Sequence, residues 1–234
     1  MLLRFGLLCG VVGLVTTSSA SLVIYSGNDA GASSIDPRPL SNAAAANFDA
    51  AAAGLGPVNL VTFESAPVGP YSNLLVAPGV TMNGIDDFLG QQQILNAPFS
   101  PPEALFGYNT TAGGTHFASM LGGTLTISFA TPIQAFGAYF SGVQTALGHT
   151  IQFNDGVAQT VNLVQGSAGG LQFLGFTDVG KSISSITLTL TFDDIAFDDM
   201  RYTAASSVPE PAMPVTVGLG LIGLLRRRNQ RGIN

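Results

Sequence analysis

The stretch around residue 188 constrains the fold of this chain more than any other part of its sequence. Four apolar residues alternate one by one with three threonines: Ile186, Leu188, Leu190 and Phe192 against Thr187, Thr189 and Thr191. Successive side chains of a β-strand point to opposite faces of a sheet. The alternation therefore predicts a strand with one face in a core and the other in solvent.

Several other stretches share this two-residue period. They are residues 58–64, 79–84, 124–129, 133–140, 151–153, 157–164 and 195–202. Asn154-Asp155-Gly156 is a tight turn between two of these strands, since its residues accept positive φ. Asp193-Asp194 is interpreted as another turn, and the Gly- and Pro-rich residues 86–123 as loops that carry one strand.

A different pattern precedes the strands. Residues 41–53 are rich in alanine, which favours helix, and Gly54 is placed to end it. Phe48 is its one large apolar residue and is expected to dock on the sheet. Residues 21–36 are expected to form a first strand or a loose arm. The pattern indicates a mainly β protein, a jelly-roll-like β-sandwich with one short N-terminal alanine-rich helix; a β-barrel is the alternative.

Residues 1–20 have the three parts of a secretory signal peptide. Arg4 supplies the positive charge, residues 5–15 the apolar stretch, and Ser18 and Ala20 the small residues of a cleavage site. Cleavage is expected before Ser21, so the remaining chain is predicted to be exported.

The last part of the chain holds three ordered features. The motif Val208-Pro209-Glu210-Pro211 is followed by the apolar residues 212–225 and then by Arg226, Arg227 and Arg228. As a helix the apolar stretch spans about 21 Å, against about 30 Å for the hydrocarbon core of a bilayer. Arginines favour the cytoplasmic side, which places the body outside. We expect a short transmembrane helix that retains the protein transiently; an ordinary single-pass anchor is the alternative.

This order of features resembles the PEP-CTERM sorting signal. In that family an exosortase, a membrane-embedded transpeptidase-like enzyme of Gram-negative bacteria, recognises the motif and processes the tail. Such proteins usually accompany exopolysaccharide production. The resemblance implies a protein of the cell surface or extracellular matrix, with an exosortase as its processing partner and a brief stay in the inner membrane. Met213-Pro214 and residues 229–234 depart from the pattern and leave the start of the helix open.

The predicted divisions are a signal peptide at residues 1–20, an N-terminal arm and helix at 21–57, a β-sandwich domain at 58–204 and a sorting tail at 205–234. Between residues 21 and 204 lie thirteen acidic and three basic residues, a net charge of −10. Such a field repels nucleic acid and attracts divalent cations. The single cysteine, Cys9, lies in the leader, so the exported part is expected to have neither disulfide nor thiolate site.

Two acidic motifs lie near the first and last strands of the predicted domain. Phe63-Glu64 and the run that ends in Asp198-Asp199 resemble the ends of galactose-binding-like jelly rolls, the fold of many carbohydrate-binding modules. The resemblance implies that Glu64, Asp198 and Asp199 hold a structural calcium where the first and last strands lie side by side. Alternatively, these acids simply end strands in solvent, as is expected of Asp86-Asp87 and Asp193-Asp194.

The sequence offers little for catalysis. His116 and His149 stand in no hydrolase motif and are expected to be polar loop residues. Candidate aromatic platforms for sugar are Tyr71, Tyr108 and Tyr139. Asn109-Thr110-Thr111 fits a glycosylation pattern that recurs by chance.

The leading interpretation is therefore a non-enzymatic, exopolysaccharide-associated surface or matrix protein. A calcium-dependent carbohydrate-binding module and a secreted hydrolase are the alternatives.

Overall fold

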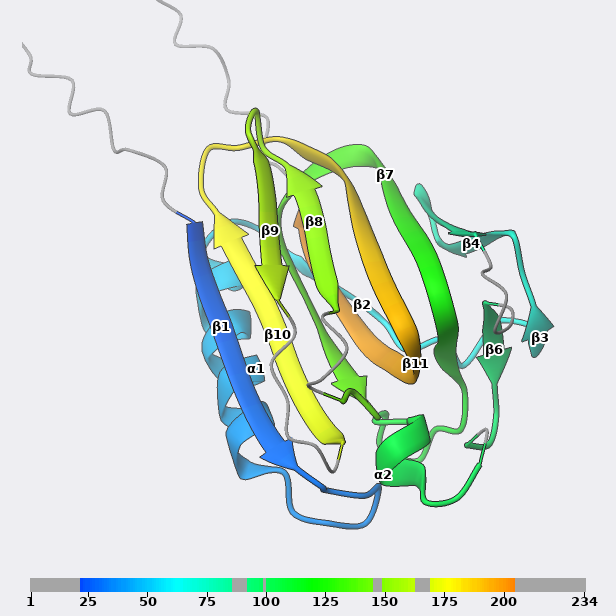
Figure 1. Cartoon of the computed structure of the whole chain (residues 1–234). Helices are drawn as coiled ribbons and strands as arrows, with labels where there is room; N and C mark the ends of the chain where they lie inside the picture. The colour runs from blue at the N-terminus through cyan, green and yellow to red at the C-terminus, as the bar shows by residue number, and fades with distance from the viewer. Residues whose placement is uncertain (1–21, 86–91, 99, 145–148, 163–168, 205–234) are drawn as a thin grey trace, which may run out of the picture.

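The computed structural model describes residues 22–85, 92–98, 100–144, 149–162 and 169–204, and β-strands dominate it (Figure 1). The elements in chain order are β1 (Leu22–Ala30), α1 (Pro39–Ala53), β2 (Val58–Val61), β3 (Gly69–Pro70), β4 (Asn73–Ala77), β5 (Val80–Ile85), β6 (Gln93–Leu95), α2 (Glu103–Phe106), β7 (Phe117–Ser141), β8 (Thr150–Asn154), β9 (Ala158–Asn162), β10 (Gly170–Asp178) and β11 (Ile183–Ala204). The predicted leader and sorting tail lie outside the described residues.

Strand β7 turns a corner and takes part in two layers. Its residues 117–119 pair with β6 and residues 124–129 with β5, whereas residues 135–141 pair with β10. Pro132 lies between the two halves, where its missing N–H leaves no gap in a ladder.

Strand β11 follows the same course beside β7. Its residues 186–189 pair with β8, and its residues 200–203 pair with β2. Ile186 lies opposite Ile127 in one layer, and Tyr202 lies opposite Phe136 in the other.

The two bent strands join two layers into a sandwich. We call the layer of β1, β10, the second half of β7, the second half of β11 and β2 the helix-covered layer. The outer layer contains β9, β8, the first half of β11, the first half of β7, β5 and β4. Rings from the two layers meet in the core between them: Phe153 stacks on Phe176 at 4.1 Å, and Phe129 lies 5.3 Å from Tyr202.

A second, smaller core lies between α1 and the other face of the helix-covered layer. Figure 1 shows α1 behind β1 and β10. Phe48 is fully buried there and packs on Phe173 and Tyr25, with ring centroids 5.6 and 5.8 Å away. The N-terminus of α1 is capped from β1, because the Asp29 carboxylate accepts the N–H of Ser41 at 2.8 Å.

The main predictions for the fold are confirmed. The chain forms a mainly β sandwich rather than a barrel, the alanine-rich helix is present, and the turn at Asn154-Asp155-Gly156 joins β8 to β9. Neither helix in the described part of the chain has the length and apolar character that a membrane crossing requires.

Two predictions for the fold are wrong. The pair Asp193-Asp194 is not a surface turn, because both residues are buried within β11. Their carboxylates have partners there, which a turn in solvent would not need. The range 86–123 also carries two strand segments rather than one, since β6 lies at Gln93–Leu95 and β7 already begins at Phe117, where its first residues pair with β6.

Candidate functional site

The predicted acidic residues meet at one loop of the sandwich. Strand β2 pairs with the end of β11, with Val61 opposite Met200, so Glu64, which follows β2, lies at the same end of this strand pair as Asp198 of β11. Both carboxylates bind residues 109–116, which connect α2 to β7 and which we call the site loop. The structure thus confirms that the first and last strands of the predicted domain lie side by side.

Glu64 binds the second half of the site loop. Its Oε1 accepts the backbone N–H groups of Thr115 and His116, each at 3.0 Å, and the side-chain amide of Asn109, also at 3.0 Å. Backbone N–H groups that converge on one carboxylate hold a loop without any regular ladder. The preceding Phe63 has a φ of 61°, which is rare for an aromatic residue, and its ring is buried against Phe197.

Asp198 binds the first half of the site loop and is fully buried. Its Oδ2 accepts the backbone N–H groups of Thr110 at 2.8 Å and Thr111 at 3.1 Å. Burial, and next the charge of Asp199, raise the pKa of Asp198 to about 7, although hydrogen bonds from Thr110, Asp199 and Thr111 oppose the shift.

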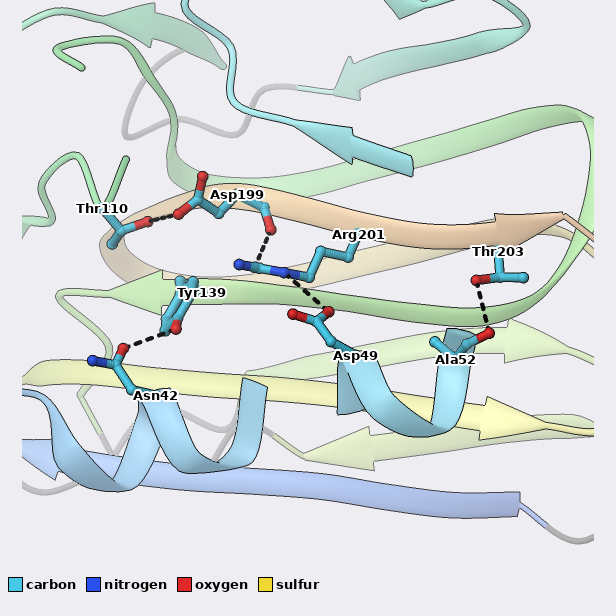
Figure 2. A network of polar contacts seen from close by, with 8 residues as sticks. All are labelled: Asn42, Asp49, Ala52, Thr110, Tyr139, Asp199, Arg201 and Thr203. Carbon is cyan, nitrogen blue, oxygen red and sulfur yellow. Dashed lines mark hydrogen bonds and ion pairs between the residues drawn. The ribbon is translucent and has the colours of Figure 1, made fainter. Parts of the chain in front are cut away.

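Asp199 links the site loop to α1 through a short network (Figure 2). Its carboxylate accepts the Thr111 hydroxyl at 2.8 Å, and its backbone carbonyl accepts a guanidinium N–H of Arg201 at 2.7 Å. Arg201 also pairs with Asp49 of α1 at 3.3 Å and lies over the ring of Tyr139, 5.2 Å from its centroid. The site loop is therefore anchored to the helix as well as to the strands.

A polar cavity of about 360 Å³ lies beside the site loop, and we call it the loop cavity. The site loop forms one wall and residues 96–98 another, and the lining is completed by Ser34, Arg38, Glu103, Tyr108 and Phe117. The carboxylate of Glu103 accepts hydrogen bonds from the backbone N–H of Ser34 at 2.7 Å and from the Ser34 hydroxyl at 2.6 Å. These two bonds hold the Glu103 side chain in place.

Arg38 differs from the other basic residues of the described chain. Lys181 pairs with Asp155 at 3.7 Å and Arg201 pairs with Asp49, whereas Arg38 forms no ion pair among the described residues. Its guanidinium therefore brings positive charge and several donors to the loop cavity of an otherwise acidic domain.

The three predicted ligands, Glu64, Asp198 and Asp199, do not suit calcium equally well. The described residues contain no group of three or more His, Cys, Asp or Glu side chains arranged to hold a metal ion. Glu64 already accepts N–H donors, which a cation would have to displace. Asp199 fits better, because its oxygens accept the hydroxyls of Thr110 and Thr111, and a hydroxyl can turn a lone pair toward a cation.

The tyrosine platform hypothesis is wrong for two of its three residues. Tyr108 and Tyr139 are buried, at 1% and 7% exposure, and their hydroxyls donate to Ala32 and Asn42. Both rings pack in the core beneath α1, which covers a face that would otherwise be solvent-exposed. Tyr71 is partly buried against the main core.

His149 is not the polar loop residue that the sequence predicts. It is buried, and its Nε2 lies 2.7 Å from the carboxylate of Asp193, which also accepts the N–H of Gln144. His116, in contrast, does lie in the site loop as expected.

The sequence pattern does not indicate which residues line the loop cavity. Arg38, Asn96 and Glu103 come from three separate segments that no motif connects. The one local signal was the tripeptide Asn109-Thr110-Thr111, whose three side chains each bind a carboxylate of the site.

Comparison with known proteins gives structural likeness alone. No family model and no curated protein matches the sequence. Among solved structures, TmCBM61 in complex with β-1,4-galactotriose aligns over 61% of this chain and 94% of its own, with 11% identity and a TM-score of 0.38. The K2 cleaved adhesin domain of Lys-gingipain aligns over 62% and 97%, with 14% identity and a TM-score of 0.39. CBM29-2, a family 29 carbohydrate-binding module, aligns over 67% and 99%, with 9% identity and a TM-score of 0.31. Likeness at these values assigns no ligand and no activity to this chain.

Proposed function

We propose that this chain is an exported, non-catalytic surface or matrix protein that binds exopolysaccharide at the loop cavity. The observation that carries the proposal is the anchoring of the site loop by Glu64, Asp198 and Asp199. Because the loop is fixed in the free protein, its polar groups are presented without the entropic cost of ordering them on binding. Hydroxyl, amide, carboxylate and guanidinium groups together match the hydroxyl-rich surface of a sugar.

The lining of the loop cavity favours binding over hydrolysis. Glycoside cleavage by the common mechanisms uses two carboxyl groups that flank the bond. Of the described residues that line the cavity, Glu103 alone carries a carboxyl group, and two donors of Ser34 already bind it. Turnover of a polysaccharide that stops when Glu103 is changed to glutamine would instead favour the secreted hydrolase.

Replacement of Arg38 by alanine tests the loop cavity directly. We expect about ten-fold weaker binding to immobilised exopolysaccharide from the producing cell, because charge-assisted hydrogen bonds from the guanidinium are lost. Lys181→Ala is the matched control, since it removes the same charge from a residue that pairs with Asp155 on another part of the surface. Equal binding by both variants and the unaltered chain would refute the cavity as the binding site.

Calcium at Asp198 and Asp199 is a second element of the proposal. Asp199, with the hydroxyls of Thr110 and Thr111 beside it, would hold such an ion, which would supply positive charge next to the buried carboxylate of Asp198. EDTA is then expected to lower the melting temperature, because calcium at about a hundred times its Kd stabilises a folded protein by about 2.7 kcal/mol. Asp199→Asn should abolish this difference, whereas Asp36→Asn, at an exposed acid bound to Ser33, should retain it. A melting curve indifferent to EDTA would exclude the ion.

The predicted sorting tail implies that an exosortase processes the protein during its export. If an exosortase processes the tail, mass spectrometry of the exported protein should find residues 218–225 missing. A Glu210→Ala variant should keep an intact C-terminus, because the Pro-Glu-Pro motif is what the enzyme recognises in the family that the tail resembles. An intact C-terminus on the unaltered exported protein would leave only the ordinary membrane anchor.

A further inference from the structure

The outward face of the outer layer carries a continuous row of uncharged polar side chains. Asn73 lies opposite Asn83, Asn83 opposite Thr126, and Thr126 opposite Thr187. Thr187 in turn lies opposite Gln152, and Gln152 opposite Thr160. We call these six residues the polar row; they come from β4, β5, β7, β11, β8 and β9, which makes the row run across the strands rather than along them.

The polar row points away from the core. Its sequence neighbours Leu125, Ile127, Ile186 and Leu188 are buried between the layers, and alternation along a strand places Thr126 and Thr187 on the opposite face. The amide side chains and Thr160 at the two ends of the row are exposed, and the two central threonines are half-buried by their neighbours. The hydroxyls of Thr126 and Thr187 lie 3.3 Å apart, so one donates to the other and one hydrogen is left for a ligand.

This face has no charge, although the domain around it is strongly acidic. None of the outer-layer strand segments (73–77, 80–85, 124–129, 150–154, 158–162 and 183–190) contains Asp, Glu, Lys or Arg. Protein interfaces favour aromatic residues and arginine, neither of which the polar row contains. A charged polymer would find no partner along the row, whereas a neutral chain of hydroxyl groups would find a donor or acceptor on every strand.

The spacing of the row suits an extended polymer. Neighbouring strands lie about 4.8 Å apart, which is close to the length of one pyranose unit in an extended β-linked glycan. A hollow of about 290 Å³ lies over one end of the row, lined by Gln152, Thr160 and Thr187 among others. At the other end Leu75 and Ile85 are exposed, at 67% and 63%, and offer apolar contact to the C–H face of a sugar.

We propose that the polar row binds an uncharged, extended β-linked polysaccharide that lies across the strands with about one sugar unit on each. This surface shares no residue with the loop cavity, so the inference goes beyond the function proposed above. Figure 1 shows β9, β8, β11 and β7, four of the strands that carry the row, following one another in that order across the molecule.

The test uses the exported chain and neutral β-linked oligosaccharides of increasing length. Isothermal titration with β-1,4-linked glucose and mannose oligomers and β-1,3-linked glucose oligomers should show an affinity for at least one series that rises with length up to about six units, the number of strands crossed. Oligomers of a uronic acid with the same lengths should bind more weakly. A triple variant, Thr126→Val, Thr187→Val and Gln152→Leu, keeps the shape of the side chains and should weaken binding about ten-fold or more, because hydrogen bonds are lost on three neighbouring strands.

Two controls separate this surface from other effects. Thr131→Val makes the same chemical change at the exposed corner of β7 and should leave affinity unaltered. Arg38→Ala should also leave it unaltered, so failure of the loop cavity and failure of the polar row are distinguishable. The inference is overturned if no neutral series binds, if affinity does not grow with length, or if the folded triple variant binds like the unaltered chain.

Discussion

Replacing Phe48 with alanine is expected to lower the free energy of unfolding by about 3–5 kcal/mol, the usual range for a fully buried phenylalanine. Phe48 is 0% exposed and is the main side chain by which α1 contacts the sheet. The other residues of α1 in this core are alanines, which are too small to close the space that the ring leaves. Urea unfolding followed by circular dichroism would measure the loss.

The sheet is shaped to receive this ring, which allows a sharper test. Gly175 and Gly137 lie opposite each other on β10 and β7. A Cβ on Gly175 would lie 2.8 Å from Cδ2 of Phe48, so Gly175→Ala should itself destabilise the protein by about 1–3 kcal/mol. In the Phe48→Ala background part of that clash is relieved, and the two changes together should destabilise less than their sum by about 1 kcal/mol or more.

The control for this cycle is Phe106→Ala, which removes the same side chain from a half-buried position on α2. Its loss of stability should be clearly smaller, and Gly175→Ala should add to it without coupling. Strict additivity of Phe48→Ala and Gly175→Ala would show that the ring does not pack on the glycine pair.

The strands that the sequence could predict are those that have one face in the core and the other face in solvent. Residues 124–129 and 186–190 alternate cleanly because threonine faces solvent and leucine or isoleucine faces the core. Strand β10 shows no alternation, because all nine of its residues are buried, with the main core on one side and α1 on the other. The same cover explains why Tyr139, which points away from the main core that holds Phe136 and Phe140, is buried rather than available to a sugar.

The candidate site was predictable only where it depends on strand order. Glu64 and Asp198 come together because β2 pairs with the end of β11, which the resemblance of the two motifs to the ends of galactose-binding-like jelly rolls implied. Their actual partners are backbone N–H groups of the site loop, and every residue except proline carries such a group. Apart from the tripeptide Asn109-Thr110-Thr111, the sequence therefore gives no signal for the loop, and it gives none for the pairing of His149 with Asp193.

The second large effect concerns pH. Burial, and to a lesser degree the charge of Asp193, raise the pKa of Asp194 to about 7, against a hydrogen bond from Ser119 that lowers it. In the unfolded chain this carboxyl ionises near its ordinary value of 3.8. Between these two values the folded state holds more protons, so stability falls as pH rises through the window. At one pKa unit per about 1.4 kcal/mol, the contribution of Asp194 is at most about 4 kcal/mol.

Asp194→Asn isolates this contribution, because the amide keeps the acceptor for Ser119 Oγ, 3.0 Å from the carboxylate oxygen, and removes the charge. The unaltered protein should unfold at lower urea concentration at pH 8 than at pH 5, and the variant should lose a large part of that difference. Asp36→Asn is the contrasting change, since hydrogen bonds from Ser33 lower the pKa of Asp36 and place its titration below this window. If stability still falls between pH 5 and 8 in Asp194→Asn, the buried carboxylate responsible is a different one. The first candidates are then Asp178 and Asp198, since burial raises their pKa values to about 6 and about 7.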